Sequence, residues 1–220
     1  MMKLIMTLML ACLVMAAAGA EENWQLVKDK DQIQIFATQK TGHKLKHHKA
    51  ETEINKDVDT ILAALQDTAA CPEWVYQCIT NKMVEMIDVK QRIYHTSIDS
   101  PLWFKSRDFY LQSDVSFDPK TRSFVIVLVS IPNHAGFQEN HVRLTDVSMI
   151  WRLHPIGESL TAVSYEVYID PELPIKSINH QMIKRSIFKT IEGLRHLVEK
   201  PIYAQTKYTA SELEMLVELD

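Results

Sequence analysis

The chain has 220 residues, of which 46% are hydrophobic, and 28 acidic residues stand against 24 basic ones for a net charge of −4. This length and composition are typical of one globular domain with an ordinary hydrophobic core. The mild acidity and the lack of a long basic run exclude nucleic acid as an expected partner, because clustered Lys and Arg bind a phosphate backbone.

The first twenty residues are typical of a secretory signal peptide. Lys3 gives a short positive start, residues 4–18 carry no charge, and the sequence AGA at 18–20 forms an A-x-A cleavage site. The run is too short for a transmembrane helix, and Cys12 lies inside it, not at the cleavage point of a lipoprotein. We expect cleavage after Ala20 and a periplasmic or secreted protein, with the lack of an N-x-S/T sequon favouring a bacterial periplasm.

Two strands and a helix are predicted at the start of the exported chain. Residues 32–36 alternate polar and apolar up to the turn signal Thr41-Gly42, and residues 46–54 would form the partner strand. Asp57 then suits the N-cap of a helix that runs to about residue 65.

Three histidines, His43, His47 and His48, lie close together in this strand region. Because neighbouring residues of a strand point to opposite faces, the three do not converge on one metal ion, and we expect them to be solvated. The remaining cysteines have no paired histidines nearby and fall short of a zinc set. We expect neither a metal nor another cofactor.

Cys71 and Cys78 are the two cysteines that remain after export. On one continuous helix their Cα atoms would lie about 10 Å apart, which is too far for a disulfide. Pro72 disfavours the helical conformation at Cys71 and lets the chain bend. A disulfide between them is therefore expected in an oxidising compartment, and two half-buried thiols are the alternative.

From Ile79 onward the hydrophobic period changes to two, which is typical of strands. The predicted strands cover about residues 79–88, 91–99, 107–117, 122–131, 140–154 and 159–170. Asp118-Pro119-Lys120 and Pro155-Ile156-Gly157 are predicted as turns. Successive antiparallel hairpins followed by a helix indicate an α+β fold.

Residues 174–198 are predicted to form one long helix. Pro174 suits its first turn, and Pro201 lies just past its end. Apolar residues recur every three to five positions and form a broad stripe, namely Ile175, Ile178, Met182, Ile187, Ile191, Leu194 and Val198. A curved antiparallel sheet wrapped around this helix, about 37 Å long, would leave room for an internal apolar cavity.

Strand parity identifies the side chains that we expect to face this helix. They are Arg107, Phe109, Leu111, Ser113, Val115 and Phe117; Arg143, Val147, Met149, Trp151 and Leu153; Val163, Tyr165, Val167 and Ile169; and Ile93, His95, Ser97 and Asp99. A sealed core rarely holds so many polar groups, because each needs a partner. A cavity for an amphipathic ligand would use a few of them.

A series of short motifs runs through the second half of the chain. The motifs are Ser100-Pro101, Ser106-Arg107-Asp108-Phe109, Val142-Arg143, Trp151, Pro155, Thr161, Val163, Tyr165, Asp170-Pro171 and Leu173-Pro174. In their order and spacing they resemble the START lipid-transfer domain family, over about residues 24–198. The resemblance implies a helix-grip fold with a deep pocket for one lipid or sterol, on which no chemistry is performed. It marks Arg107, Asp108, Asp170 and Pro174 as family-motif residues.

The resemblance makes the loop at 100–106 part of a lid, in which two aromatic residues would cap the ligand or meet a membrane surface. The expected ligand-binding residues are Trp103, Phe104, Arg143, Met149, Trp151, Tyr165, Ile178 and Met182. Sterol-carrying members often place an arginine where this chain has Ser113. Arg143 with Asp99 would substitute for it by strand parity, so the ligand class stays open between lipid, sterol and fatty-acyl compound.

Two other functions remain open beside a lipid-binding monomer. The first is a helix-grip enzyme of the aromatase/cyclase type, although the five glycines exclude the G-x-G-x-x-G, P-loop and G-x-S-x-G motifs and no H-E-x-x-H occurs. The second is a non-catalytic periplasmic protein that binds a partner. The START-like domain covers residues 21–200 and is followed by the tail 201–220. The tail would support the partner-binding function, because Ser211-x-x-Glu214 begins a short amphipathic segment.

Overall fold

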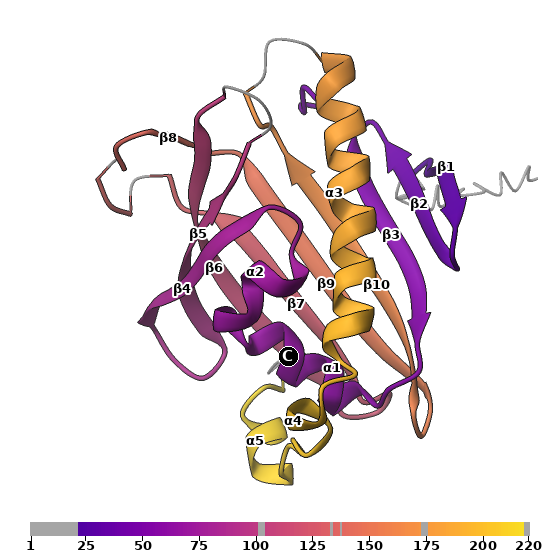
Figure 1. Cartoon of the computed structure of the whole chain (residues 1–220). Helices are drawn as coiled ribbons and strands as arrows, with labels where there is room; N and C mark the ends of the chain where they lie inside the picture. Colours follow the sequence, from indigo (N-terminus) through magenta and orange to yellow (C-terminus); the bar gives the residue numbers. More distant parts are fainter. Residues whose placement is uncertain (1–21, 101–103, 133, 137, 173–175, 218–220) are drawn as a thin grey trace, which may run out of the picture.

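The chain folds into one curved, mainly antiparallel sheet with a long helix across one of its faces (Figure 1). The structure, a computed structural model, describes residues 22–100, 104–132, 134–136, 138–172 and 176–217, with the backbone alone at 176–178. In this part of the chain ten strands form the sheet, in the order β1-β2-β3-β10-β9-β7-β6-β5-β4, and β8 pairs in parallel with β6. The predicted α+β helix-grip arrangement is confirmed.

The strands are β1 (Gln25–Lys30), β2 (Ile33–Thr38), β3 (His47–Ile54), β4 (Cys78–Met86), β5 (Gln91–Ile98), β6 (Ser106–Asp118), β7 (Ser123–Ser130), β8 (His141–Arg143), β9 (Val147–Gly157) and β10 (Leu160–Ile169). The helices are α1 (Val58–Gln66), a 3₁₀ turn η1 (Thr68–Ala70), α2 (Cys71–Trp74), α3 (Lys176–Leu197), α4 (Pro201–Ala204) and α5 (Ala210–Glu214). Asp57 caps α1 as predicted, because its Oδ1 accepts a hydrogen bond of 2.9 Å from the backbone N–H of Thr60.

Strand β1 was not predicted. It forms a hairpin with β2 through Asp31 and Gln32, whose φ angles of 53° and 59° are left-handed. Such two-residue turns are usually signalled by Asn-Gly or Asp-Gly, and neither occurs here. All but one of its side chains are exposed, so the strand also lacks the apolar alternation that indicates a buried face.

The predicted strand over 140–154 is wrong in one respect, because it is two strands separated at residues 144–146. Strand β7 pairs with β6 from Leu111 onward, and β8 pairs with the earlier β6 residues 106–108. The turn predicted at Pro155-Ile156-Gly157 is also wrong. These residues extend β9, and Gly157 pairs with Leu160 across the two residues that connect the strands.

The three histidines were predicted to be solvated, and this is wrong for the two on β3. His47 is 5% exposed, and its ring stacks on Tyr168 at 4.7 Å with His43 at 4.6 Å, so the segment before β3 covers this face. His48 is 3% exposed on the opposite face, where its ring lies 5.9 Å from that of His180 on α3. Both faces of β3 are therefore buried at this end of the strand.

The inward side of α3 packs on the sheet and on α2. Ile187, Ile191 and Leu194 are at most 2% exposed, as the predicted apolar stripe requires. Gly193 lies in close contact with α2, since a Cβ atom there would stand 2.9 Å from the Cα and carbonyl carbon of Trp74. The glycine is therefore required by the contact between the two helices, in spite of its low helix propensity.

Residues 201–217 pack back on the domain. Tyr203 is buried and donates a 2.8 Å hydrogen bond to Asp67, and Val217 forms a bridge with Phe117 of β6. The capping box predicted from Ser211 is formed instead by Thr209 and Glu212, so α5 begins at Ala210. In the described ranges, no helix has both the length and the apolar character needed to cross a membrane.

Candidate functional site

A cavity of about 200 Å³ lies between the sheet, α2 and α3. Its wall on the sheet side comes from successive strands whose inward residues are mostly apolar: Phe109, Leu111, Val115, Ile126, Leu128, Met149, Trp151, Tyr165, Val167 and Ile169. The helices close it with Trp74, Val75, Met182, Ile183 and Ile187. The long helix α3 and the curved sheet thus border a space that their apolar side chains do not fill.

An aromatic cluster forms the centre of the sheet wall. Trp151 and Tyr165 are cross-strand partners on β9 and β10, and their rings stack 3.8 Å apart. The Tyr165 hydroxyl donates to the sulfur of Met149 at 3.4 Å, and the ring of Trp74 lies 6.0 Å from that of Trp151. Burial raises the pKa of Tyr165 well above its usual value, so the phenol stays neutral and adds to an apolar surface.

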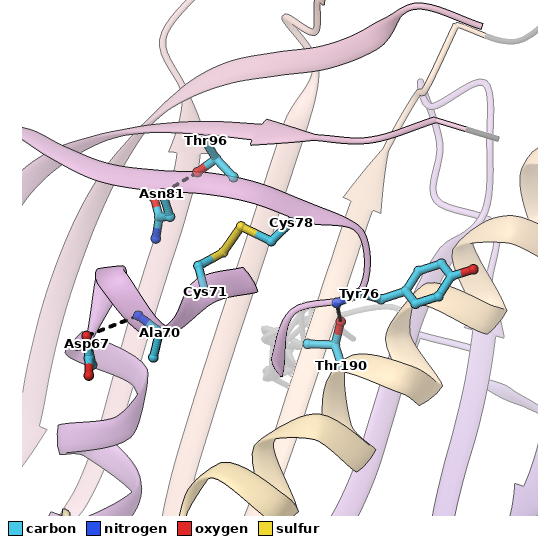
Figure 2. The surroundings of a disulfide bond; sticks show 8 residues. All are labelled: Asp67, Ala70, Cys71, Tyr76, Cys78, Asn81, Thr96 and Thr190. Carbon is cyan, nitrogen blue, oxygen red and sulfur yellow. Dashed lines mark hydrogen bonds between the residues drawn. A yellow bond between two sulfur atoms is a disulfide. The ribbon is translucent and has the colours of Figure 1, made fainter. Parts of the chain in front are cut away.

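The cavity wall opposite the sheet depends on a disulfide between Cys71 and Cys78, whose Cα atoms lie 6.0 Å apart (Figure 2). Figure 2 also shows the backbone N–H of Tyr76 donating to Oγ1 of Thr190 on α3, at 3.2 Å. Helix α2 has only four residues and needs such links to hold its position. Sequence reasoning considered the disulfide but did not assign Trp74, Val75 or Tyr76 to the site.

On β5 the side chains that face the cavity are those of opposite parity to the prediction. Tyr94 and Thr96 face it because their cross-strand partners on β6 are the inward residues Leu111 and Phe109. The predicted set of Ile93, His95 and Ser97 is therefore wrong, and only Asp99, which lies beyond the end of β5, lines the cavity. Pairing with a strand of known orientation was the signal that would have given the correct face.

The motif residues Arg107 and Asp108 point to opposite faces of β6. Arg107 lines the cavity, is 4% exposed and donates to the hydroxyl of Ser100 at 2.9 Å and to the carbonyl of Pro171 at 3.2 Å. Burial lowers the pKa of its guanidinium, which these neutral acceptors hold in place. Arg107 thus ties the segment before β6 to the segment before α3.

Arg143 was predicted to bind ligand, and this is wrong, because it lies on the outer face of the sheet. Its Nη2 and Nε donate to Oδ2 of Asp108 at 2.7 and 3.1 Å, and Nε2 of His95 lies 3.0 Å from the same oxygen. Burial opposes the charge of Asp108, yet the hydrogen bonds from Arg143 and His95 hold its pKa below the usual value. The suggested pairing of Arg143 with Asp99 is therefore also wrong. Parity read from β9 does not carry across the break that precedes it.

The structure brings half of the eight predicted ligand-binding residues together at the cavity, namely Met149, Trp151, Tyr165 and Met182. Phe104 is half-buried with its ring 5.7 Å from the guanidinium of Arg107, but it does not line the cavity. Asp170 accepts a 3.0 Å hydrogen bond from the N–H of Glu172 and so shapes the segment before α3. Trp103, Pro174 and the side chain of Ile178 lie outside the described residues.

Groups suited to acid–base or metal chemistry are sparse at this cavity. Of the described residues that line it, none is a histidine, Asp99 is the sole carboxylate, and Cys71 is in the disulfide. Across the described part of the chain, no three His, Cys, Asp or Glu side chains gather as metal ligands. The hydrogen bond of 2.8 Å between Ser97 and His141 belongs to the outer face, near the point where β8 pairs with β6.

Comparison with known proteins gives a family match over most of the chain. A model of the START domain family matches residues 7–201. An uncharacterized protein of Pseudomonas aeruginosa is 27% identical over 196 residues, covering 87% of this chain and 95% of the relative.

Two solved structures show the extent of the structural likeness. A STAR-related lipid transfer protein fragment from Xanthomonas axonopodis superimposes with a TM-score of 0.73 at 18% identity, covering 80% of this chain and 99% of that one. Zhui aromatase/cyclase from Streptomyces sp. R1128 superimposes with a TM-score of 0.53 at 10% identity, covering 71% of this chain and 94% of that one. At these identities the likeness concerns the fold.

Proposed function

The chain belongs to the START domain family, and from this premise we propose that it binds one hydrophobic molecule in the cavity and carries or senses it without catalysis. The molecule is a lipid, a sterol or a fatty-acyl compound. The observation that carries the proposal is the wall of Met149, Trp151 and Tyr165 facing Met182 across an unfilled space. Apolar surface of this kind gains free energy when an apolar ligand replaces water, at about 25 cal/mol per Å².

The alternative is a helix-grip enzyme acting on a hydrophobic substrate, and the fold likeness to an aromatase/cyclase favours it. The cavity argues for binding alone, because acid–base catalysis needs a positioned proton donor or acceptor beside the reacting atoms. The described lining residues include one carboxylate, Asp99, and no histidine, so they are poorly suited to acid–base catalysis. A non-catalytic protein that binds a partner remains the third candidate.

Native mass spectrometry of the purified protein, followed by organic extraction, separates these functions. One co-purified molecule near one-to-one supports the proposal. A ligand-free mass with turnover of a polyketide or thioester would establish the enzyme instead, and a ligand-free mass with no binding to a lipid panel would favour the partner-binding protein.

Access to the cavity is part of the proposal. Entry of a ligand requires a local opening at the least stable edge of the cavity. Of the residues between β5 and β6, Asp99 and Ser100 line the cavity, as does Arg107 on β6. We propose that Trp103 and Phe104 meet a membrane surface while the ligand passes. We also propose that the protein is exported to the periplasm, where a disulfide persists.

Replacing both Trp103 and Phe104 by Ala should slow lipid transfer between vesicles severalfold and leave the melting temperature nearly unchanged. A loss of several kcal/mol of stability would instead show that they are packed core.

A further inference from the structure

Arg92 brings a positive charge to a cavity that is otherwise mostly apolar. It lies on β5 with its side chain lining the cavity, on the same face as Tyr94 and Thr96. Its cross-strand partner on β6 is Ser113, a small residue that also lines the cavity and is 2% exposed. The Nε of Arg92 is buried and has no hydrogen-bond partner among the described residues.

The second arginine at the cavity is in a different state. Arg107 donates to the Ser100 hydroxyl and the Pro171 carbonyl, so its hydrogen-bonding capacity is used within the protein. Arg92 forms no hydrogen bond or ion pair of this kind in the part of the chain that the structure describes. A partly buried guanidinium without a partner is unfavourable, and an anion supplied from outside would relieve this cost.

None of the described residues that line the cavity offers Arg92 a carboxylate nearby. The only carboxylate among the described lining residues is Asp99, seven positions further along the chain, or about 23 Å at ~3.3 Å per residue in an extended strand. Asp59, whose charge acts on the nearby Tyr208, is not among the residues that line the cavity. Gln66 and Thr68 are neutral lining residues, and the side-chain carbonyl of Gln66 accepts a 3.1 Å hydrogen bond from the hydroxyl of Tyr208.

The Tyr208 phenol is itself held neutral, so it does not serve as the missing anion. Burial raises its pKa to about 12, the nearby charge of Asp59 acts in the same direction, and the charge of Arg92 opposes them. Arg92 therefore lies close enough to influence this hydroxyl, and unlike Asp59 it lines the cavity.

We propose that Arg92 binds the anionic head group of a single-chain amphiphile whose tail lies along the apolar wall toward Met182. This rests on the proposed binding function and names its ligand class. A guanidinium suits a carboxylate because two parallel N–H groups match its two oxygens. The volume of about 200 Å³ is below the range of about 300–1,000 Å³ typical of ligand pockets, which favours one chain over two.

The test compares dodecanoate with 1-dodecanol, which share a tail and differ in the charge of the head group. Both compete for the purified protein against a fluorescent apolar probe. We expect the wild-type protein to bind dodecanoate at least tenfold more tightly than the alcohol. Arg92→Gln should weaken dodecanoate binding about tenfold or more and leave binding of the alcohol within about twofold. Arg152→Gln, at an exposed position on β9, is the matched control and should change neither.

A second variant covers the case in which Arg92→Gln fails to fold. Ser113→Asp places a carboxylate beside Arg92 and should block dodecanoate while the alcohol still binds. Equal affinities for both probes in the wild-type protein, or an equal loss of both in a folded Arg92→Gln, would overturn the assignment of Arg92 and leave the binding function standing. If the wild-type protein binds neither probe nor any other lipid, the proposed function fails as well.

Discussion

Gly193 is a residue at which the backbones of α2 and α3, the two helices beside the cavity, come into close contact. Replacing a helical glycine by alanine normally stabilises a helix by about 1 kcal/mol. Here the new methyl group would overlap the backbone of Trp74, and neither backbone moves easily. We therefore predict that Gly193→Ala lowers the free energy of unfolding by about 1–3 kcal/mol, as overpacking does.

Urea unfolding measures this change. Gly136→Ala is the control, because a Cβ there meets no atom within 4 Å, and its effect should stay within about 0.5 kcal/mol. A Gly193→Ala protein as stable as the control would show that α2 and α3 are not in close contact in solution.

His48 makes the stability of the protein depend on pH. Burial, reinforced by the neighbouring His180, lowers the pKa of His48 from 6.5 to about 4. Between these values the unfolded chain binds a proton that the folded chain does not, so this part of the stability is complete above pH 6.5 and is lost as pH falls toward 4. The loss is at most about 3 kcal/mol.

Unfolding free energies of the wild-type protein and His48→Leu, measured from pH 7 down to 5, test this dependence. The variant should show a flatter slope over this range. Glu166, whose pKa is lowered to about 2 by the neighbouring His47 ring and by its hydrogen bond from Lys40, adds its own loss from about pH 4.5 downward. Identical slopes in both proteins would mean that His48 is not buried in its neutral form.

At the scale of single elements, α2 depends on its covalent link to β4. The disulfide closes a short loop, for which the chain-entropy account gives about 2.5 kcal/mol. We predict that reduction, or Cys71→Ser with Cys78→Ser, lowers stability by about this amount and weakens ligand binding, because Trp74 and Val75 lose their fixed position at the cavity.

Alkylation before and after reduction, together with unfolding curves, measures this effect. Protein produced in an oxidising compartment should resist alkylation until reductant is added. Two reactive thiols in this protein before reduction, or unchanged ligand affinity after reduction, would contradict the role given to the disulfide.

The elements also show what the sequence is able to predict. Trp151 and Tyr165 were assigned correctly because each lies within a long strand, where the period of two is uninterrupted. Arg143 was misassigned because a break between β8 and β9 resets the parity, and nothing in the hydrophobic pattern marks that break. On β5, the polar residues His95 and Ser97 were assigned to the cavity, but they lie on the outer face of the sheet. This part of the outer face is also buried, together with Asp108 and Arg143.

Other parts of the site depend on tertiary contacts that no local pattern encodes. The position of Trp74 follows from the disulfide and from the approach of α2 to Gly193. Arg92 was not singled out, because its role follows from its partner Ser113 and from the described lining residues near it, none of which is a carboxylate. Both depend on strand pairing.

At the scale of the whole molecule, the fold is a sheet that curves around one helix and leaves a space between them. The sheet side of this space comes from residues far apart in the sequence, from Asn81 on β4 to Ile169 at the end of β10. The helix side comes from α2 and α3, which the disulfide and the Gly193 contact hold in place. The central claim is that a hydrophobic molecule occupies this space.

Filling the space tests that claim most directly. Met182→Trp enlarges a half-buried residue that lines the cavity, whereas Ile202→Trp adds the same group at a position that is 70% exposed. Titration with dodecanoate or an extracted native lipid should give one site per chain in the wild-type protein and in Ile202→Trp. In a folded Met182→Trp the affinity should fall at least tenfold. Undiminished one-to-one binding by Met182→Trp would place the ligand elsewhere and contradict the account.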